Sequence, residues 1–472
     1  MPDFVSAGTG RIVKAPTDAR ARHDAAVGRL AASYAAIPLD APVRLAKKTS
    51  NLFRARARTD APGLDVALLD QVIAVDAQAR TADVQGMCTY EHLVEATLPH
   101  GLAPLVVPQL KTITLGGAVT GLGIESTSFR SGLPHESVLE MDILTGAGEI
   151  VTARPEGEHA DLFHGFPNSY GTLGYATRLR IALEPVDPFV ALRHVRFHDV
   201  ESLVATMGRI CDAGEHEGER VDYLDGVVFS ATESYLTLGR KTAQPGPVSD
   251  CTGQQVYYRS IQHGSPLPKV DRLTIHDYLW RWDTDWFWCS RAFGAQNPRV
   301  RRLWPRRYRR SSFYWKLIAL DHRFDVADRL EARKGRPPRE RVVQDIEVPL
   351  GRTAEFVHWF LREIPIEPIW LCPVRSKDQW PLYPLKPGQT YVNVGFWSSV
   401  PRDPAEPDGA ANRLIEEQVT ALDGHKSLYS DAYYDETQFW RLYGGDTYAD
   451  LKRRYDPKSR LLDLYSKAVQ RK

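Results

Sequence analysis

Residues 108–132 read PQLKTITLGGAVTGLGIESTSFRSG, and this stretch decides the fold. Four of its glycines, Gly116, Gly117, Gly121 and Gly123, stand among small hydroxyl residues where neither a strand nor a helix is expected. Glycine has no Cβ, so such a backbone can approach another group closely. Converging N–H groups form a concavity that suits the oxygens of a phosphate or of a planar cofactor ring. The alternative is a Gly-rich turn within a β region.

The segments on both sides of this stretch predict short strands and a helix. Upstream, Val72–Asp76 and Thr81–Gln85 have the pattern of a β-hairpin, and residues 89–102 then show helical spacing. Downstream, residues 136–153 predict a second hairpin, and residues 161–183 predict a turn with aromatic residues and glycine followed by a strand. The predicted order is hairpin, helix, Gly-rich crossing, hairpin, turn and strand.

This order resembles the FAD-binding domain of the vanillyl-alcohol oxidase superfamily, the PCMH type, from residue 42 to residue 185. The resemblance implies an α+β fold, with a two-subdomain PCMH-type FAD-binding domain and a cap or substrate domain whose antiparallel sheet is flanked by helices. We expect the FAD-binding domain at residues 1–190, the cap at 191–410, and a segment at 411–472 that closes the active site and returns to the first domain. The resemblance implies the cofactor-binding residues Thr112, Thr114, Leu115, Gly116, Gly117, Gly121, Gly123, Ser126, Ser128, His135, Gly171, Thr172 and Gly174.

The loop expected to meet the pyrophosphate of the cofactor departs from the superfamily pattern. It has no glycine between Ala41 and Pro62. It offers cationic, hydroxyl and amide groups instead, at Lys47, Lys48, Thr49, Ser50 and Asn51. Such groups bind a pyrophosphate directly, and the alternative is a solvated charge run after a strand. Because no histidine lies between His23 and His92, we expect FAD without a covalent link to this loop.

Composition limits the class of protein. With 472 residues the chain has room for two or three domains, and its net charge of +1 gives no overall attraction to nucleic acid. The five cysteines form no CxxC pair, which indicates reduced thiols in the cytoplasm and neither a disulfide framework nor a metal site. No signal peptide and no apolar run of membrane-spanning length is found. We therefore expect a cytoplasmic protein, soluble or bound to the inner face of the plasma membrane.

Beyond residue 190 the pattern predicts a longer antiparallel sheet with helices on one face. The segments predicted as strands are residues 219–241, 254–262, 340–350, 367–374 and 390–397. The segments predicted as helices are residues 200–214 and 353–364.

Residues 278–316 have the most unusual composition of the chain, with six tryptophans and a dense group of arginines. Tryptophan at a lipid headgroup interface and arginine against phosphate would suit a peripheral membrane site. We therefore predict contact with an anionic membrane through residues 280–310. Nucleic acid, which the net charge disfavours, and a core aromatic cluster beside a solvated basic loop are the alternatives.

Motifs in both predicted domains resemble the Δ24-sterol reductase branch of the superfamily. They are GIESTS (residues 123–128), VVQDIEVP (342–349), EPIWLCP (367–373) and LYSDAYYDETQFWRLYGGDTYADLKRRYDP (428–457). We expect the chain to depart from the eukaryotic enzymes in two ways: it should lack their N-terminal membrane anchor, and its Trp/Arg segment differs from theirs. Bacterial relatives in this branch include flavoproteins that reduce a methylene group on a membrane fatty acyl chain. The resemblance thus implies reduction of a lipid C=C bond, on a sterol side chain or a methylene fatty acyl chain.

An isolated C=C bond has no carbonyl to hold charge, so its reduction needs a hydride at one carbon and a proton at the other. Flavin supplies the hydride, and an acid in a dry pocket supplies the proton. We predict Tyr433 as the group that donates or positions the proton, and Glu347 and Glu125 as further candidate acids. Gln344 and Trp440 are expected to shape the substrate site. For each of these residues, a packing role is the alternative.

Because no GxGxxG motif follows a strand, the chain shows no separate nicotinamide domain, and the resemblance implies NADPH as a transient electron donor. Two other classes of function are retained. An FAD-dependent oxidase or dehydrogenase of an alcohol, such as a sugar or hydroxy acid, predicts a polar pocket with a base. A lipid-binding protein that has lost its chemistry predicts purification without flavin.

Overall fold

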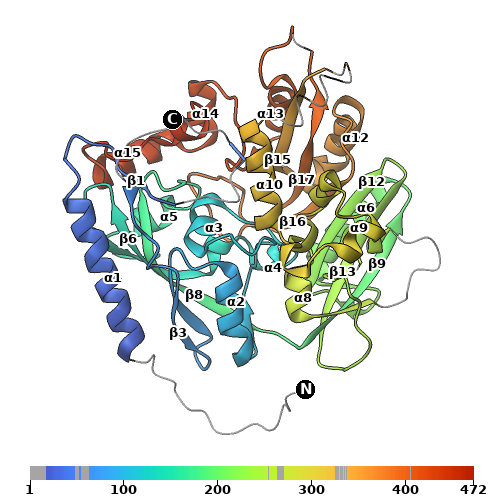
Figure 1. Ribbon diagram of the computed structural model, residues 1–472, viewed down its shortest axis with the longest axis horizontal. Coiled ribbons are helices and arrows are strands. Elements are labelled where there is room, and N and C mark those ends of the chain that lie inside the picture. Colours follow the sequence, from blue (N-terminus) through green and yellow to red (C-terminus); the bar gives the residue numbers. More distant parts are fainter. Residues whose placement is uncertain are drawn as a thin grey trace.

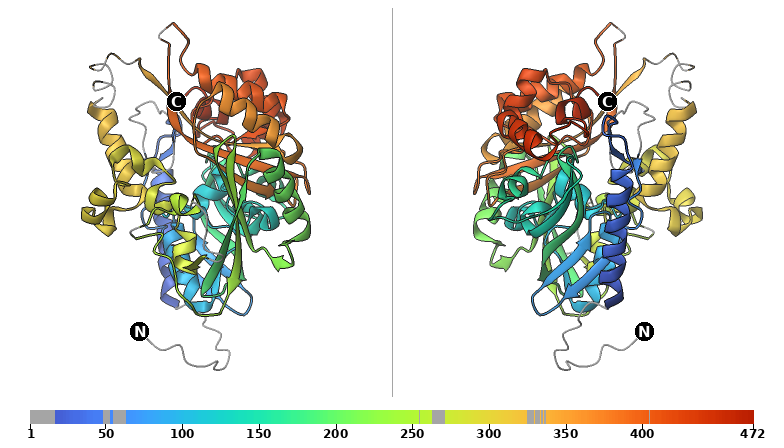
Figure 2. Two further views of the ribbon diagram at one scale, coloured as in Figure 1. Left: turned by 90° about the vertical axis from the view of Figure 1, so that its right-hand side faces the viewer. Right: turned by 90° about the vertical axis from the view of Figure 1, so that its left-hand side faces the viewer.

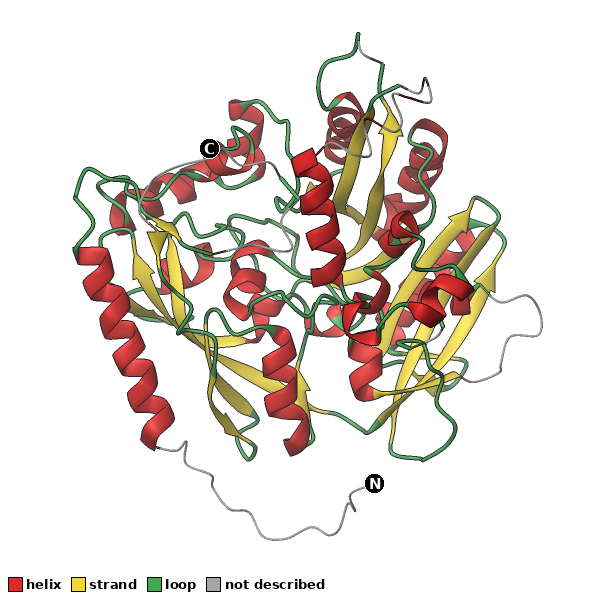
Figure 3. Ribbon diagram, viewed as in Figure 1, coloured by secondary structure: helices red, strands yellow, loops and turns green. Residues whose placement is uncertain are grey.

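Two antiparallel sheets form the frame of the molecule and lie side by side (Figures 1 and 3). The computed structural model describes residues 17–47, 53–54, 63–253, 255–262, 271–324, 329, 333, 335, 337–403 and 405–472. One sheet has six strands and the other has eight. This architecture confirms the predicted α+β fold with antiparallel sheets.

The six-stranded sheet is built from the N-terminal part of the chain, in the order β3-β4-β8-β6-β7, with β5 paired to β8. The hairpins predicted on either side of the Gly-rich stretch are confirmed, and β3 and β4 have the predicted bounds. The elements of this part are α1 (Thr17–Ala35), β1 (Arg44–Leu45), β2 (Gly63–Leu64), β3 (Val72–Asp76), β4 (Thr81–Gln85), α2 (Tyr90–Thr97), β5 (Leu102–Pro104), α3 (Leu115–Gly121), α4 (Ser128–Ser131), β6 (Val138–Thr145), β7 (Ile150–Ala153), α5 (Ala160–Gly165) and β8 (Gly174–Pro185).

The Gly-rich stretch contains two short helices, α3 and α4, where the sequence predicted none. Helix α3 begins after Thr114, whose Oγ1 accepts a hydrogen bond from the N–H of Gly117 at 3.2 Å. Gly116 allows α3 to pack closely, because a Cβ there would lie 2.6 Å from the carbonyl oxygen of Gly86. A side-chain cap and close packing therefore outweigh the poor helix propensity of glycine.

The eight-stranded sheet has the order β14-β9-β13-β12-β16-β17-β15-β18. The chain enters it directly after β8. Most of the predicted strands and both predicted helices are confirmed; the strand predicted at residues 254–262 is wrong, because this segment contains α7. The elements are β9 (Phe189–Phe197), α6 (Val200–Ala213), β12 (Tyr223–Ser230), β13 (Glu233–Thr242), α7 (Tyr257–Ile261), β14 (Asp271–Thr274), α8 (Ile275–Leu279), α9 (Pro298–Leu303), α10 (Ser311–Phe324), β15 (Arg339–Pro349), α12 (Thr353–Glu363), β16 (Ile369–Arg375), β17 (Thr390–Pro401), α13 (Ala410–Ala421) and β18 (His425–Lys426), and a small hairpin of β10 (Glu215–His216) and β11 (Glu219–Arg220) follows α6.

Alternation along β15 separates the two faces of this sheet. Val342, Ile346 and Val348 are fully buried in a core shared with α6, α12 and α13. Because successive side chains of a strand point to opposite faces, Asp345 and Glu347 point to the other face, toward the N-terminal part of the chain. The pattern of the strand thus places two carboxyl groups on the inner face of the sheet.

The Trp/Arg segment packs against the same inner face, so the proposal that its tryptophans contact a membrane needs correction. Trp280, Trp282, Trp286 and Trp288 are only 1–3% exposed. The indole of Trp288 donates to the carbonyl oxygen of Trp397 on β17 at 3.3 Å. These four side chains belong to the hydrophobic core. The sequence had left a core aromatic cluster open as an alternative to membrane contact.

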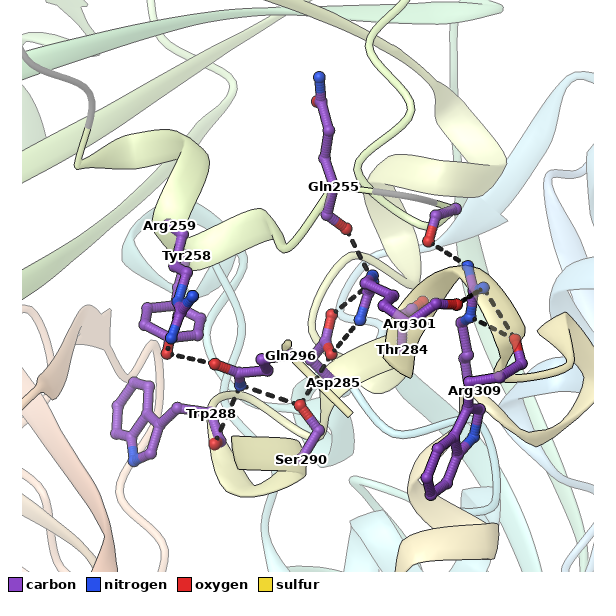
Figure 4. A network of polar contacts seen from close by, with 12 residues as sticks. Gln255, Tyr258, Arg259, Thr284, Asp285, Trp288, Ser290, Gln296, Arg301 and Arg309 are labelled. Carbon is purple, nitrogen blue, oxygen red and sulfur yellow. Dashed lines mark hydrogen bonds and ion pairs between the residues drawn. The ribbon is translucent and has the colours of Figure 1, made fainter. Parts of the chain in front are cut away.

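Three arginines of this segment, Arg281, Arg301 and Arg309, are also internal, and Figure 4 draws the last two. Arg301 forms two hydrogen bonds with the carboxylate of Asp285, at 2.7 and 3.0 Å. Arg309 donates to backbone carbonyl oxygens, including that of Trp304 at 2.8 Å. The buried arginines therefore tie loops together. Arg299, Arg302, Arg306 and Arg307, on and after α9, remain exposed, while Arg310 is half-buried and pairs with Glu91 at 2.7 Å.

The C-terminal segment returns from β18 to the first sheet. Its helices are α14 (Glu436–Leu442), α15 (Gly445–Tyr455) and α16 (Leu464–Ala468). Helix α15 packs on α5, and Nζ of Lys467 donates to the carbonyl oxygen of Tyr170 at 2.6 Å. Figure 1 shows α14 and α15 above the first sheet. The domain limits at residues 190 and 410 stay a prediction. Of the helices in the described ranges, none combines the length and hydrophobicity needed to cross a membrane.

Candidate active site

A cavity of about 740 Å³ is lined by both sheets and by the C-terminal segment. Its size falls within the roughly 300–1,000 Å³ range of cofactor and ligand sites. Residues from the Gly-rich stretch and from the inner face of the second sheet line the same space. The cavity is therefore the place where a cofactor and a substrate could meet.

Many of the predicted cofactor-binding residues line this cavity. The hydroxyl of Thr114 accepts a hydrogen bond from Nζ of Lys47 at 3.0 Å, while it also caps α3. The turn before β8 contributes Gly171, which has a positive φ of 74° that glycine adopts readily. The predicted residues that line the cavity are Thr112, Thr114, Gly116, Gly117, Gly121, Gly123, Gly171 and Gly174.

Of the described residues predicted to bind the cofactor, the others do not line the cavity. Leu115 is buried in the core, and Thr172 donates to the carbonyl oxygen of Ser169 at 2.7 Å. Ser126 donates to Glu125 at 2.7 Å, and the Ser128 hydroxyl accepts from the N–H of Glu125 at 3.1 Å. These four residues hold the shape of the surrounding backbone.

His135 also lies outside the cavity and is buried. Its ring meets that of Trp380 edge-on, with the ring centroids 4.4 Å apart. Burial lowers the pKa of His135 to about 3. The predicted pyrophosphate-binding residues Lys48, Thr49, Ser50 and Asn51 lie outside the described residues.

Basic side chains also line the cavity, and the sequence had singled out only Lys47 among them. Arg54 donates to the carbonyl oxygen of Leu428 at 2.5 Å and stacks on the ring of Tyr170 at 4.9 Å. Cations, hydroxyl groups and a Gly-rich backbone around one space fit a cofactor that carries phosphates. The basic residues of the lining are Arg44, Lys47, Arg54, Lys467 and Lys472.

Aromatic side chains form an apolar wall of the cavity. Phe287 stacks on Trp397 with ring centroids 4.0 Å apart, and it meets the ring of Trp370 at 5.5 Å. Phe53 stacks on Trp286 at 5.5 Å. All five residues line the cavity. Such a wall accommodates an apolar substrate, since it offers large hydrophobic contact area.

A polar cluster is embedded in this aromatic wall, around Asp345 on β15. Nδ2 of Asn393 donates to Oδ1 of Asp345 at 3.1 Å, and the hydroxyl of Tyr429 hydrogen-bonds to the same carboxyl group. Nε1 of Trp397 donates to the hydroxyl of Tyr429 at 3.1 Å. Burial raises the pKa of Asp345 to about 6, although both hydrogen bonds act against this rise.

The predicted catalytic residues do not line the cavity. Tyr433 lies on the outer side of the C-terminal segment, where the guanidinium groups of Arg413 and Arg471 stack on its ring at 4.9 and 5.1 Å. Glu125 forms a buried ion pair with Arg281 at 2.7 Å.

Glu347 lies on the same face of β15 as Asp345 but is fully buried behind the lining. Its Oε1 is 3.5 Å from the hydroxyl of Ser427, which does line the cavity. Burial, and secondarily the neighbouring Asp345, raise the pKa of Glu347 well above its ordinary value.

The two predicted substrate-binding residues also point elsewhere. Gln344 is on the helix-covered face of β15, where its Nε2 donates to Oδ1 of Asn412 at 2.6 Å. Trp440 stacks on Tyr448 with ring centroids 5.0 Å apart. The alternation of VVQDIEVP could have signalled this, because three of its apolar residues share a face with Gln344 and leave Asp345 on the opposite one.

Comparison with known families identifies the cofactor. The FAD binding domain family model matches residues 25–154, which include the hairpins, α2, α3 and the Gly-rich stretch. This match and the lining of the cavity define the chain as an FAD-dependent oxidoreductase, as the sequence predicted.

Similarity to individual proteins indicates which branch of FAD-dependent enzymes this chain resembles. The chain is 27% identical to the Delta(24)-sterol reductase of Rattus norvegicus over 416 residues, covering 85% of this chain and 76% of the relative. It is 25% identical to the Delta(24)-sterol reductase of Arabidopsis thaliana over 445 residues, covering 86% and 76%. Cytokinin dehydrogenase 9 of Oryza sativa subsp. japonica is 30% identical over 163 residues, covering 34% of this chain and 30% of the relative. The predicted resemblance to the sterol reductase branch is confirmed.

Proposed function

We propose that this protein is an FAD-dependent reductase of an isolated C=C bond in a lipid, with NADPH as the electron donor. The similarity to Delta(24)-sterol reductases extends over 85% of the chain and so includes the second sheet as well as the FAD binding domain. The lipid is a methylene fatty acyl chain or a sterol side chain, and the experiment below separates the two.

The observation that carries the proposal is the composition of the cavity. The five aromatic residues of the wall and the Gly-rich stretch line one space of about 740 Å³. An apolar chain placed against this wall would exclude water from the reacting carbons, which hydride transfer to an alkene requires. The aromatic wall favours a lipid over a sugar or a small hydroxy acid, which would need several polar partners.

The residues around the cavity fit FAD. We infer that Thr112 and Thr114 meet the cofactor through their hydroxyl groups and that the glycines of α3, which lack a Cβ, let it approach the backbone closely, while Lys47 and Arg44 face its phosphates. When bound, FAD supplies the hydride chemistry. The protein positions the alkene against the aromatic wall, keeps the space dry and provides the proton.

An anaerobic visible spectrum of the purified protein tests this function. We expect flavin absorption that bleaches on adding NADPH and returns on adding a lipid with a reducible C=C bond. Phospholipid with a methylene acyl chain and a Δ24-sterol are added separately, and the one that restores the absorption identifies the substrate. Bleaching by a small alcohol without NADPH would replace the proposal with an alcohol oxidase or dehydrogenase. Flavin that no lipid reoxidises would also contradict it.

We further propose that the exposed face of α9 contacts an anionic membrane that holds the lipid. Leu303 is 84% exposed, and the arginines beside it in the chain, Arg299, Arg302, Arg306 and Arg307, are exposed. Figure 2 shows α9 and α10 standing out from the rest of the molecule on one side. Arginine against lipid phosphate and an apolar side chain below the headgroups suit a membrane surface.

Flotation with lipid vesicles tests this contact. The protein should float with phosphatidylglycerol vesicles and less with phosphatidylcholine vesicles, and L303E combined with R302E should abolish the difference. R29E, an exposed change on α1, is the control and should not alter flotation. Equal binding to both vesicle types, or full binding by the double variant, would refute the contact.

A further inference from the structure

Asp345 differs in chemistry from the other residues that line the cavity. Among the described residues that line it, Asp345 is the only one whose side chain carries a carboxyl group. It lies among the aromatic rings of Trp370 and Trp397, which line the same wall. A carboxyl group set in an apolar wall is a costly arrangement, so it calls for a functional explanation.

The neighbours of Asp345 hold its carboxyl group in place. Asn393 donates to Oδ1 from β17, and Tyr429 reaches the group from the segment after β18. Trp397 in turn donates to the hydroxyl of Tyr429 at 3.1 Å, which fixes the direction of that hydroxyl. Three residues from two elements therefore orient one acid toward the cavity.

Among the described residues, Asp345 has hydrogen-bond partners but no ion-pair partner. The titratable and charged groups around it are as follows. On its own strand, Glu347 is buried and its pKa is raised. On β18, His425 is opposite Glu347, and burial lowers its pKa to about 4, so it is neutral at neutral pH. Tyr429 and Tyr170 have raised pKa values through burial, and Arg54 is engaged with Leu428 and the ring of Tyr170.

This environment suits a proton donor. Burial raises the pKa of Asp345 to about 6, so a useful fraction of the carboxyl group stays protonated near neutral pH. A tyrosine whose pKa lies well above 10 is a far weaker acid toward an alkene. General acids work best when their pKa is near the working pH.

We propose that Asp345 is the general acid that protonates the alkene, and that Tyr429 and Asn393 are positioning residues that orient its carboxyl group. This inference rests on the proposed function. As the π bond breaks, one carbon takes the proton of Asp345 and the other takes a hydride from the reduced cofactor. Asp345 is left as a carboxylate, and a proton from solvent restores it before the next turnover.

The test separates the two half-reactions of the holoenzyme. In D345N, reduction of the flavin by NADPH should keep its rate, while reoxidation by the lipid should slow by about 10²–10⁴-fold. D345E should recover part of the loss. D423N removes an exposed carboxyl group in the loop before β18 and should behave as wild type.

A second readout does not depend on activity. In protein labelled with ¹³C-aspartate, the Asp345 carboxyl signal should titrate near pH 6, and Y429F should raise its pKa because a hydrogen bond to the carboxylate is lost. The lipid reoxidation rate of wild type should fall as pH rises through that same value. If D345N does not retain flavin, Y429F carries the test, since its pH profile must move to higher pH.

The outcomes distinguish this inference from the proposed function. If wild-type flavin is not reoxidised by any lipid, the proposed function fails. If wild type is reoxidised and D345N is reoxidised at a similar rate, the function stands and Asp345 is not the acid. A carboxyl signal that titrates near pH 4 in wild type, or a pH profile unchanged in Y429F, would likewise overturn the inference.

Discussion

Gly395 lies directly opposite Asp345 in the antiparallel pairing of β15 with β17. A Cβ on Gly395 would lie 2.5 Å from Oδ1 of Asp345 and 2.7 Å from the ring of Trp397. The absence of a side chain at residue 395 therefore makes the space that the carboxyl group occupies. A cross-strand pair in which one partner is glycine is an unusual way to seat an acid in a sheet.

We expect G395A to displace the carboxyl group and to reduce lipid-dependent flavin reoxidation at least tenfold. The crowding should also lower the free energy of unfolding by about 1–3 kcal/mol. Urea unfolding and the reoxidation rate measure the two effects. G351A is a matched control, because nothing lies within 4 Å of a Cβ at that position. Wild-type reoxidation in G395A would show that the position of Asp345 does not matter.

The pH dependence of stability gives a separate prediction for Asp345. Its pKa is about 6 in the folded protein and roughly 3.9 in an unfolded chain. Between these values the folded state binds more protons than the unfolded state, so the free energy of unfolding falls as pH rises from about 4 to about 6. The fall should be on the order of 1–2 kcal/mol, since Asp345 is partly accessible from the cavity.

Urea unfolding at several pH values compares wild type with D345N, in which this fall should be absent. The raised pKa of Glu347 also makes the free energy of unfolding fall as pH rises, and it does so in both proteins. Only the difference in unfolding free energy between the two proteins therefore reports on Asp345. A constant difference in unfolding free energy from pH 4 to pH 7 would contradict the raised pKa.

Local patterns in the sequence predict much of the fold. The bounds of β3 and β4 follow from an apolar run of VIAVD and from the alternating pattern of TADVQ, which a polar turn separates. The helix α3 does not follow from its glycines, because it depends on the cap from Thr114 and on close packing against Gly86. Composition likewise cannot tell a buried tryptophan from an interfacial one. The partner of Trp288, Trp397, is 109 residues away in the chain.

The candidate site was harder to predict than the fold for a similar reason. Alternation within VVQDIEVP places Asp345 and Glu347 on one face, but only the tertiary structure shows which of them reaches the cavity. Tyr429 and Tyr433 lie in a segment without regular secondary structure, so no periodicity indicates that Tyr429 points inward and Tyr433 outward.

The buried Arg281 predicts a large effect on stability. Its Nη2 donates to Glu125 at 2.7 Å and to Asp225 at 2.9 Å, and all three side chains are almost fully buried. R281M would leave two buried carboxyl groups without their cation, so we expect a loss of about 3–5 kcal/mol in unfolding free energy. Urea unfolding measures it, and R299M on the exposed face of α9 should stay within about 0.5 kcal/mol of wild type. A loss of that small size in R281M would show that the ion pair is dispensable.

Thr114 should couple helix formation to retention of FAD. Its hydroxyl caps α3 through the N–H of Gly117 and accepts from Lys47, and the residue lines the cavity. T114V keeps the size of the side chain but loses both hydrogen bonds, so unfolding of the flavin-free protein should become easier by about 1 kcal/mol. T114S should remain close to wild type, since it keeps the hydroxyl.

The consequence for the cofactor appears when FAD is added back. Binding to the folded state raises unfolding free energy by about 2.7 kcal/mol when FAD is at 100 times its Kd. At one fixed FAD concentration, T114V should gain less stability than T114S, because α3 and Lys47 are no longer held for the cofactor. Thermal unfolding with and without FAD measures both gains. Equal gains in the two variants would mean that Thr114 serves only the helix, and that the phosphates of FAD are held by other groups of the lining.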